Sequence, residues 1–288
     1  MKKVIDLSEN NGQVDFKKIK QEGINDVILR IGWIGNKNNH TLDKRFNENY
    51  KEAKKNGFNV GVYVFSYCTS IETLKSGIEW VKNNLTNKIL ELPIFLDLED
   101  DVKSGTIISR IGKEILTKQA VEFCKYFENL GFKSGVYASL DWFKNKLDIN
   151  QIINYKIWLA EWNSEENHSA NFKVDLWQYT SNGKINGING RVDISKCMCN
   201  CEEKINVGEI TGESPVNGDD VEVKIYKNGL TIEPVYSDTN LKNKIGSLNS
   251  YEQCDCLGIF ENRAIVRYKV DNKNNYKIGF VKWLGGIK

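Results

Sequence analysis

The sequence predicts an α/β protein: an irregular (β/α) barrel of mostly parallel strands, followed by a small all-β barrel. Over about the first 200 residues, a polar, helix-like run repeatedly ends in glycine and a short apolar strand follows it. Continuous apolar strands that alternate with amphipathic helices indicate a parallel sheet, because such strands are buried on both faces. About seven or eight such units favour closure of the sheet into a barrel. Beyond residue 219 the helical period disappears and strand-like alternation replaces it.

Three glycines mark joints of the repeating unit: Gly23, Gly57 and Gly131. Glycine adopts the left-handed conformation that closes a helix, so we expect a helix before each glycine and a strand after it. Further strands are expected around each apolar run, at 4–5, 27–29, 60–65, 94–96, 135–137, 157–159 and 176–177. Helices are expected at roughly 43–56, 71–85 and 113–130, and Thr69-x-x-Glu72 matches a capping box at the start of the second.

Changes in composition predict the domain boundaries. We expect a barrel domain at 1–201, a polar linker with Gly and Pro at 202–218, and an all-β domain at 219–288. The evidence for the last domain is alternation at 221–226, the hairpin signal Asn228-Gly229, and strand-like runs at 264–268 and 278–281.

Composition excludes several classes of protein. With 288 residues, 40% hydrophobic and 27% charged, the chain is long enough and apolar enough to bury a core. The net charge of +2 argues against general nucleic-acid binding, which needs a basic excess. The longest uncharged stretch, residues 56–71, is too short and polar to span a membrane. Asp6 and Glu9 interrupt the basic start, so no secretory signal is expected and the chain should be made in the cytoplasm.

Cysteine and histidine usage argues against metal and thiol chemistry. The 7 cysteines are an odd number in a long chain, so no disulfide framework is expected. Cys197, Cys199 and Cys201 alternate and lack Cys-x2-Cys spacing, which favours a chance cluster or an oxidation-prone linker over a zinc site. With only 2 histidines, Cys68 has no evident partner for a cysteine peptidase, and a zinc amidase is disfavoured. We therefore expect no metal and no cofactor.

The segment 93–101 is the most informative part of the sequence. It is a buried-strand pattern that runs into acids, and Asp97 and Glu99 lie on one face because strand side chains alternate. In a β/α barrel this position is the C-terminal rim, where active sites lie. Asp6 and Asp193 lie at two further strand ends, although for Asp6 alone helix capping is an equal alternative. Asp100 and the adjacent Asp101 are interpreted as loop charges.

Aromatic residues lie near the same strand ends and can pack against the apolar faces of sugar rings. Gln178 adds an amide that can bond to sugar hydroxyls. For two of these aromatics, Trp158 and Trp177, packing in the barrel core is as good an interpretation as ligand contact. The aromatic candidates are Tyr63, Phe65, Tyr137, Trp158, Trp162, Trp177 and Tyr179.

An ordered set of motifs over about residues 2–196 resembles the family-25 glycoside hydrolases, the lysozymes of bacteria and their phages. Ile5-Asp6-Leu7-Ser8 is similar to the family's opening and Asp97-Leu98-Glu99 to its Asp-x-Glu motif. Val64 departs from the family's frequent His, and residues 31–35 are also atypical. The other motifs, in the family's order, are Val60 to Phe65, Gly135-Val136-Tyr137, Ile157 to Ala160, Leu176 to Ser181 and Gly187 to Asp193.

The resemblance implies hydrolysis of the β-1,4 bond between N-acetylmuramic acid and N-acetylglucosamine in peptidoglycan. It makes Glu99 the general acid and places an ionised Asp97 beside the N-acetyl group, whose oxygen could act as internal nucleophile. Asp193 would help to stabilise positive charge, and Asp6 would raise the pKa of Glu99. Direct attack by water is the mechanistic alternative. Alternative functions are a non-catalytic wall-binding protein or a chitinase-like glycosidase, although Phe95 replaces the extra acid of the latter.

The C-terminal part resembles bacterial SH3-like wall-binding domains, through residues 221–225 and Gly279-Phe280-Val281-x-Trp283-Leu284. The resemblance implies a cell-wall ligand, and an accessory domain without a ligand is the alternative. The absence of an expected secretory signal fits a phage or prophage endolysin, which would need a separate pore-forming protein to reach the wall. A host autolysin is the other possibility.

Overall fold

A computed structural model describes most of the barrel domain and the strands of the C-terminal part. The chain divides into two compact units, Met1–Glu213 and Ser214–Lys288. The described residues are 2–36, 39–163, 166–198, 208–209, 225–227, 232–237, 241–249, 252–260, 263–269 and 276–282.

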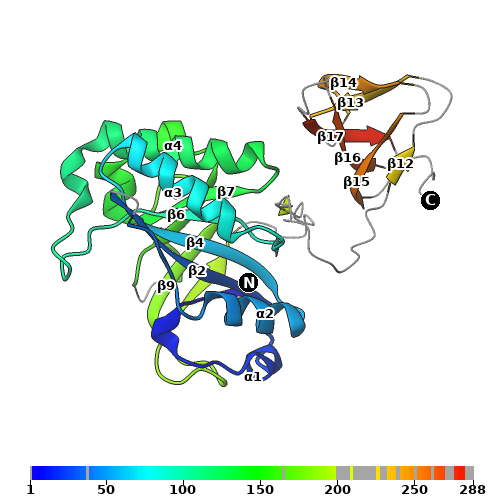
Figure 1. Ribbon diagram of the computed structural model, residues 1–288. Helices are drawn as coiled ribbons and strands as arrows, with labels where there is room; N and C mark the ends of the chain where they lie inside the picture. The colour runs from blue at the N-terminus through cyan, green and yellow to red at the C-terminus, as the bar shows by residue number, and fades with distance from the viewer. Residues whose placement is uncertain are drawn as a thin grey trace. The chain divides into compact units, whose positions relative to one another are not determined.

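Eight strands of the first unit close into a barrel (Figure 1). Neighbouring strands are parallel except at β10, which is antiparallel to both β1 and β9, and the parallel pairing of β1 with β2 closes the ring. The barrel strands are β1 (Lys3–Leu7), β2 (Asp26–Gly35), β4 (Asn59–Tyr67), β6 (Ile94–Asp97), β7 (Ser134–Ser139), β8 (Lys156–Ala160), β9 (Leu176–Gly183) and β10 (Val192–Cys197). The predicted irregular barrel of mostly parallel strands is therefore confirmed.

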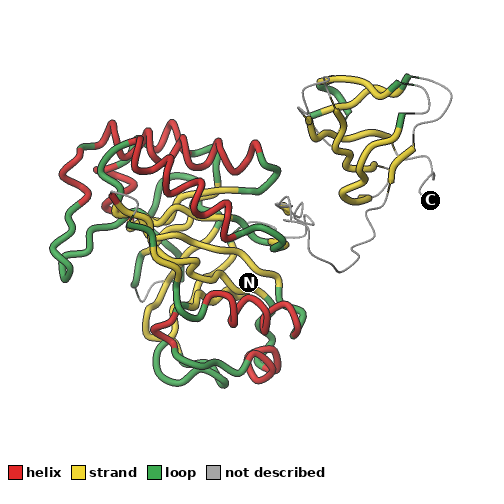
Figure 2. The backbone as a smooth tube through the Cα atoms, viewed as in Figure 1, coloured by secondary structure: helices red, strands yellow, loops and turns green. Residues whose placement is uncertain are grey.

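Helices cover the outside of the barrel (Figure 2). They are α1 (Phe16–Gln21), α2 (Phe46–Lys55), α3 (Ile71–Asn84), α4 (Lys113–Asn129) and α5 (Ile149–Ile152). Short turns at η1 (Glu9–Asn11), η3 (Ile108–Ile111) and η4 (Trp142–Lys146), and the two-residue strand β3 (Thr41–Leu42) beside β2, complete this part of the unit.

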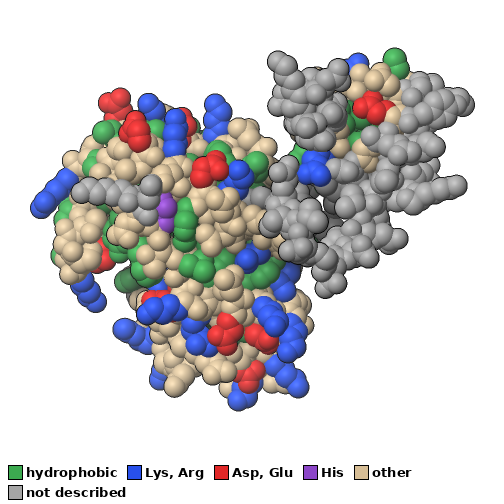
Figure 3. All heavy atoms as spheres, viewed as in Figure 1, with side chains coloured by type: hydrophobic (Ala, Val, Ile, Leu, Met, Phe, Trp, Pro, Cys, Tyr) green, Lys and Arg blue, Asp and Glu red, His purple; other side chains and the backbone are tan. Residues whose placement is uncertain are grey.

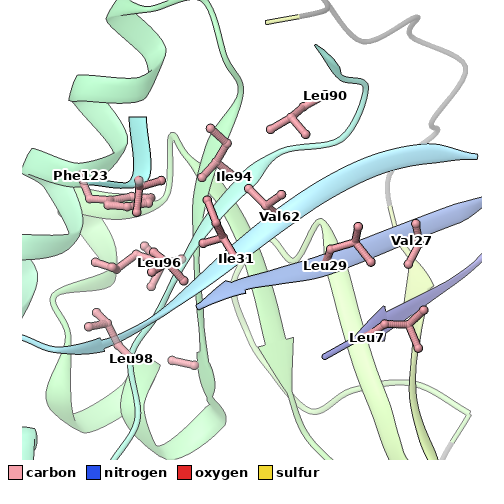
Figure 4. Packing of buried hydrophobic residues seen from close by; sticks show 14 of the residues in the cluster. Leu7, Val27, Leu29, Ile31, Val62, Leu90, Ile94, Leu96, Leu98 and Phe123 are labelled. Carbon is pink, nitrogen blue, oxygen red and sulfur yellow. The ribbon is translucent and has the colours of Figure 1, made fainter. Parts of the chain in front are cut away.

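The main hydrophobic core lies between the strands and the helices. Val62 of β4, Ile94 and Leu96 of β6 and Phe123 of α4 are all fully buried in it (Figure 4). Along each strand, every second side chain faces the helices, and the side chains between them face the inside of the barrel. This packing explains why the residues next to the site residues are apolar.

The glycine joints and three predicted helices are present, with one difference at a helix start. Gly23, Gly57 and Gly131 have φ of 78°, 71° and 87°, the left-handed conformation expected after a helix. The capping residue of α3 is wrong in the prediction: Ser70, not Thr69, accepts a hydrogen bond from the backbone N–H three residues later. The Thr69 backbone and hydroxyl groups instead donate to Asn36.

A second, smaller cluster fills the inside of the barrel with aromatic rings. Trp158 is 1% exposed, and its ring centroid lies 5.1 Å from that of Phe95 and 4.7 Å from that of Tyr137. We call Phe95, Tyr137 and Trp158 the floor, because their rings fill the inside of the barrel below the mouth. Only side chains nearer the strand ends can therefore reach a ligand.

The first unit extends to Glu213 and includes part of the predicted linker 202–218, of which the structure describes Gly208 and Glu209. β11 (Gly208–Glu209) pairs antiparallel with β5 (Ile89–Leu90). Cys197 is disulfide-bonded, a bond that the prediction of no disulfide framework did not include, whereas Cys68 and Cys124 have free thiols. Cys199 and Cys201 lie outside the described residues.

In the second unit the described strands form one antiparallel six-stranded sheet, in the order β12-β15-β16-β17-β13-β14. Runs 264–268 and 278–281 are strands as predicted; residues 221–224 and Asn228-Gly229 lie outside the described residues. The strands are β12 (Ile225–Lys227), β13 (Glu233–Tyr236), β14 (Lys244–Leu248), β15 (Gln253–Phe260), β16 (Arg263–Lys269) and β17 (Tyr276–Lys282).

Charges are mixed on the surface of the first unit. Figure 3 shows acidic and basic side chains interspersed over the visible face, in keeping with the net charge of +2. Among the described helices, none has the length and apolar character needed to cross a bilayer.

Candidate active site

Four carboxyl groups meet at one end of the barrel. Asp6 lies near the end of β1 and is paired in register with Asp193 near the start of the antiparallel strand β10. Asp97 is the last residue of β6, and Glu99 follows two residues later. Because the parallel strands end where β10 begins, all four groups lie at the carboxyl-end mouth, as the sequence predicts for a barrel site.

Asp6 and Asp193 form a hydrogen-bonded pair of carboxyl groups. Burial, followed by the charge of Asp193, raises the pKa of Asp6 well above its ordinary value. Burial also raises the pKa of Asp193, although the hydrogen bond from Asp6 opposes the rise. Both pKa values are raised, so the pair as a whole binds a proton more readily than two isolated aspartates.

Gln178 forms a hydrogen-bond network around Asp6 at the barrel mouth. Its Nε2 donates to Asp6 Oδ2 at 3.0 Å, and its Oε1 accepts from Tyr137 Oη and Trp162 Nε1, each at 3.0 Å. Because both ends of the amide are engaged, its orientation is set by the network. Gln178 thereby links an acid of the site to an aromatic ring of the rim.

Asp97 is the most enclosed acid of the group, with 2% of its surface exposed. Its Oδ1 is buried and has no hydrogen-bond partner among the described residues. Burial first, and then the charges of Glu99 and Asp6, raise the pKa of Asp97 well above its ordinary value. The direction of this shift favours the protonated form, in contrast to the ionised Asp97 that the resemblance implies.

Glu99 is poised to hold a proton near neutral pH. Burial raises its pKa from the ordinary 4.5 to about 7, with further contributions from the charges of Asp101, Asp193 and Asp100. Asp6 contributes less to Glu99 than the resemblance implies. A carboxyl group with such a pKa is suited to donate a proton and then to accept one.

Arg30 is a functional candidate that the sequence analysis did not identify. It lies on β2, and its positive charge partly opposes the rise that burial and neighbouring acids cause in the pKa values of Asp97 and Tyr63. Arg30 Nε donates to Asp43 Oδ2 at 2.8 Å, and the backbone N–H of Glu9 donates to the same oxygen at 2.9 Å. The available signal was a lone cation inside the apolar run 27–34.

The aromatic candidates divide into four groups by position. Tyr63 and Phe65 are partly exposed and lie on the β4 face opposite the helix-facing valines. Tyr137 and Trp158 belong to the floor, where Trp158 Nε1 donates to Ser195 Oγ at 3.0 Å. Trp162 is 61% exposed and is tethered through its indole N–H, which leaves its ring free to stack.

Trp177 and Tyr179 are not brought to the mouth. Strand alternation puts them on the face of β9 opposite Gln178, and Trp177 is fully buried in the outer core. The Lys196 ammonium lies 4.6 Å from the Trp177 ring and 4.9 Å from the Tyr179 ring. Both aromatics thus serve packing in this structure.

The described residues offer no group of three His, Cys, Asp or Glu side chains arranged to hold a metal ion. The Cys68 thiol is buried, and burial raises its pKa to about 11, so it is a poor nucleophile.

A barrel mouth with a proton-holding carboxyl group, further carboxyl groups and an exposed indole is typical of acid-catalysed glycoside hydrolases. A sequence model of the Glycosyl hydrolases family 25 matches residues 5–188, and the chain belongs to this family.

Several relatives support this placement. The chain is 26% identical over 231 residues to the autolytic lysozyme of Clostridium acetobutylicum, covering 80% of this chain and 65% of that protein. It is similar to the modular autolysin LytC of Streptococcus pneumoniae, solved with a synthetic peptidoglycan ligand, at 29% identity and a TM-score of 0.56 over 67% of this chain and 46% of LytC. It is also similar to the CTP1L endolysin, at 26% identity and a TM-score of 0.58 over 69% and 67% of the two chains. The chain spans less than two thirds of the length of the first two relatives.

Proposed function

We propose that the protein is a peptidoglycan hydrolase, an N-acetylmuramidase that cleaves the β-1,4 bond between N-acetylmuramic acid and N-acetylglucosamine. The observation that carries the proposal is the Glu99 carboxyl group, whose pKa of about 7 allows it to donate a proton near neutrality. Family membership and the lysozyme relatives favour peptidoglycan among glycan substrates.

In the proposed reaction, Glu99 protonates the glycosidic oxygen as its bond to C1 of the muramic residue breaks. The N-acetyl carbonyl oxygen of the same residue attacks C1 and carries positive charge in the cyclic intermediate. Water then adds at C1 and gives a proton to the Glu99 carboxylate, which restores the acid. Direct attack of water on C1 is the alternative that leaves the role of Glu99 unchanged.

Asp97 is proposed to act as an anion when positive charge develops on the substrate. In the free protein, burial and neighbouring acids raise its pKa, while Arg30 lowers it. An approaching positive charge favours the carboxylate further, so stabilisation is greatest in the transition state. The Asp6–Asp193 pair adds a negative charge to the opposite side of the mouth.

The exposed ring of Trp162 and the partly exposed rings of Tyr63 and Phe65 are proposed to contact sugar rings. Trp158 would support them from the floor without touching the substrate. We propose no metal or cofactor for this chemistry.

The C-terminal unit is proposed to be an SH3-like domain that binds a cell-wall ligand. Its described antiparallel sheet is compatible with a small β barrel. Binding to the wall would raise the local concentration of substrate without changing the chemistry. We further propose an endolysin role, in which the enzyme acts on the wall after a separate pore-forming protein releases it.

Analysis of the products from purified peptidoglycan tests the proposal. The protein should release new reducing ends, and reduction with borohydride followed by mass spectrometry should find N-acetylmuramitol at those ends. New ends carrying N-acetylglucosamine would identify a glycosidase of different bond specificity. Binding to peptidoglycan without release of reducing ends would favour the non-catalytic alternative.

A further inference from the structure

The loop between β6 and η3 is closed on itself at Asp101. The backbone N–H of Asp101 donates to the Thr106 carbonyl oxygen, and that of Thr106 donates to the Asp101 carbonyl oxygen, both at 2.9 Å. The Ser104 N–H donates to Asp101 Oδ1 at 3.1 Å. This double closure gives the Asp101 side chain a defined position two residues beyond Glu99.

Tyr67 holds the other oxygen of the same carboxylate. Its hydroxyl donates to Asp101 Oδ2 at 2.9 Å. Tyr67 is the last residue of β4 and lies on the strand face that carries Tyr63 and Phe65, with its ring centroid 4.7 Å from that of Phe65. The loop is thereby tied to the barrel wall beside the mouth.

These bonds keep Asp101 an anion. The Ser104 backbone and the Tyr67 hydroxyl lower the pKa of Asp101, because both donate to the charged form. Among the charged neighbours of Glu99, Asp101 contributes most to its raised pKa. The loop therefore presents a fixed negative charge to the general acid of the proposed mechanism.

We propose that Asp101 is a positioning residue that Tyr67 holds beside the mouth so that its charge keeps Glu99 protonated until substrate binds. This inference rests on the proposed function and extends it to two residues outside the four-acid cluster. The resulting enzyme stays active to a higher pH than the cluster alone would allow.

Other groups also face Glu99 and set the background for this effect. Asp100 is engaged by Ser109, whose N–H and hydroxyl donate to its two oxygens at 2.8 and 2.7 Å. Arg30 acts on Asp97 and on the tyrosines, Tyr63 and Tyr67. The titratable groups that interact with Glu99 are Asp6, Asp97, Asp100, Asp101, Tyr137 and Asp193.

The test compares the pH profiles of kcat/KM, which report groups of the free enzyme, for the parental protein, Asp101→Asn, Tyr67→Phe and a control, Glu22→Gln, on a soluble glycan fragment. Asparagine removes the charge and keeps one of the two accepting oxygens, the other being replaced by an NH2 group, whereas phenylalanine removes only the hydroxyl. Glu22 is exposed at the end of α1, so its change alters net charge by the same amount away from the mouth.

Loss of the Asp101 charge should lower the pKa of Glu99, so less of the acid is protonated at any given pH. We expect the alkaline limb to move down by about one pH unit in Asp101→Asn, which lowers kcat/KM about tenfold at pH 8 with little change at pH 5.5. Tyr67→Phe should move it in the same direction by a smaller amount, and Glu22→Gln should leave it in place. A uniform loss at all pH values would overturn the proposal and indicate a merely structural role.

A titration independent of turnover separates this inference from the proposed function. The Glu99 carboxyl resonance, identified by its loss in Glu99→Gln, can be followed by 13C NMR in protein labelled at glutamate. Its midpoint should fall by about one unit in Asp101→Asn. An unchanged midpoint would overturn the inference, whereas a parental protein without turnover would contradict only the proposed function.

Discussion

Two features of the environment of Glu99 raise the pKa of its carboxyl group. Its side chain is partly enclosed at the barrel mouth, and three aspartates place negative charge around it. Both effects disfavour the ionised form, so the proton stays on the carboxyl group to a pKa of about 7. The same effects that suit it for catalysis cost stability at high pH.

The pH dependence of stability should reveal this cost. Glu99 binds its proton more tightly in the folded protein than in the unfolded chain, where its pKa is ordinary. Its stabilising contribution is therefore fully present below pH 4.5 and is lost as the pH rises through about 7. Between pH 5 and pH 8 the free energy of unfolding should fall by about 2 kcal/mol more in the parental protein than in Glu99→Gln.

Urea unfolding of both proteins at the two pH values measures this difference. Asp6, Asp97 and Asp193 shift in the same direction, so the variant should retain part of the decline. Parallel pH dependence in the parental protein and the variant would show that Glu99 has an ordinary pKa.

At the residue scale, the sequence predicted which acids would meet but not every neighbour. Asp97 and Glu99 were identifiable because acids directly follow an apolar strand. The sequence did not predict that Trp158 lies inside the barrel and Trp177 outside it. Barrel strands are buried on both faces, so composition does not distinguish the two positions. Arg30 was overlooked because its role depends on neighbours from other strands.

At the scale of single elements, the start of α3 shows how a helix is attached near the mouth. Ser70 caps the first turn, and the side chain of Thr73 accepts from the Ser70 backbone N–H. The buried Gln119 of α4 donates to the carbonyl oxygens of Cys68 and Ser70. This connection also bounds β4, the strand that carries Tyr67.

Removal of the α3 cap should destabilise the barrel. Ser70→Ala leaves a backbone N–H of the first turn without its side-chain acceptor and should lower the free energy of unfolding by about 1 kcal/mol. Thr69→Ala is the matched control and should cost less, since its hydroxyl bonds only to Asn36 at an exposed position. Equal losses in chemical denaturation would favour the original assignment of Thr69 as the cap.

Other elements differ in how far sequence alone could predict them. The long helices and apolar strands were predictable from periodicity and glycine joints, because packing against a core requires those patterns. The β5–β11 pair was not, because two-residue strands have no period and pair through backbone groups. A capping box is also ambiguous where Thr69 and Ser70 are adjacent.

At the scale of the whole molecule, the chain consists of two compact units that divide after Glu213. The β11 residues beyond the predicted barrel end belong to the first unit. A catalytic fragment should therefore end at 213 instead of 201. Each unit has its own buried core among the described residues.

The fragment 1–213 should fold and keep its activity on soluble glycan within about twofold, because few contacts are expected to cross a domain boundary. Its activity on intact cells should fall more, since the proposed wall binding is lost. Circular dichroism, together with assays on both substrates, measures the two effects. An unfolded fragment, or equal activity on intact cells, would contradict the proposed division of roles.

The most direct test of the central claim is the turnover of Glu99→Gln on a defined peptidoglycan glycan. Glutamine preserves the size of the side chain but cannot donate the carboxyl proton. The account predicts that kcat falls by about 10²–10⁴-fold or more, with an unchanged circular dichroism spectrum and retained binding of the glycan. Turnover at the parental rate by the folded variant would show that Glu99 is not the general acid.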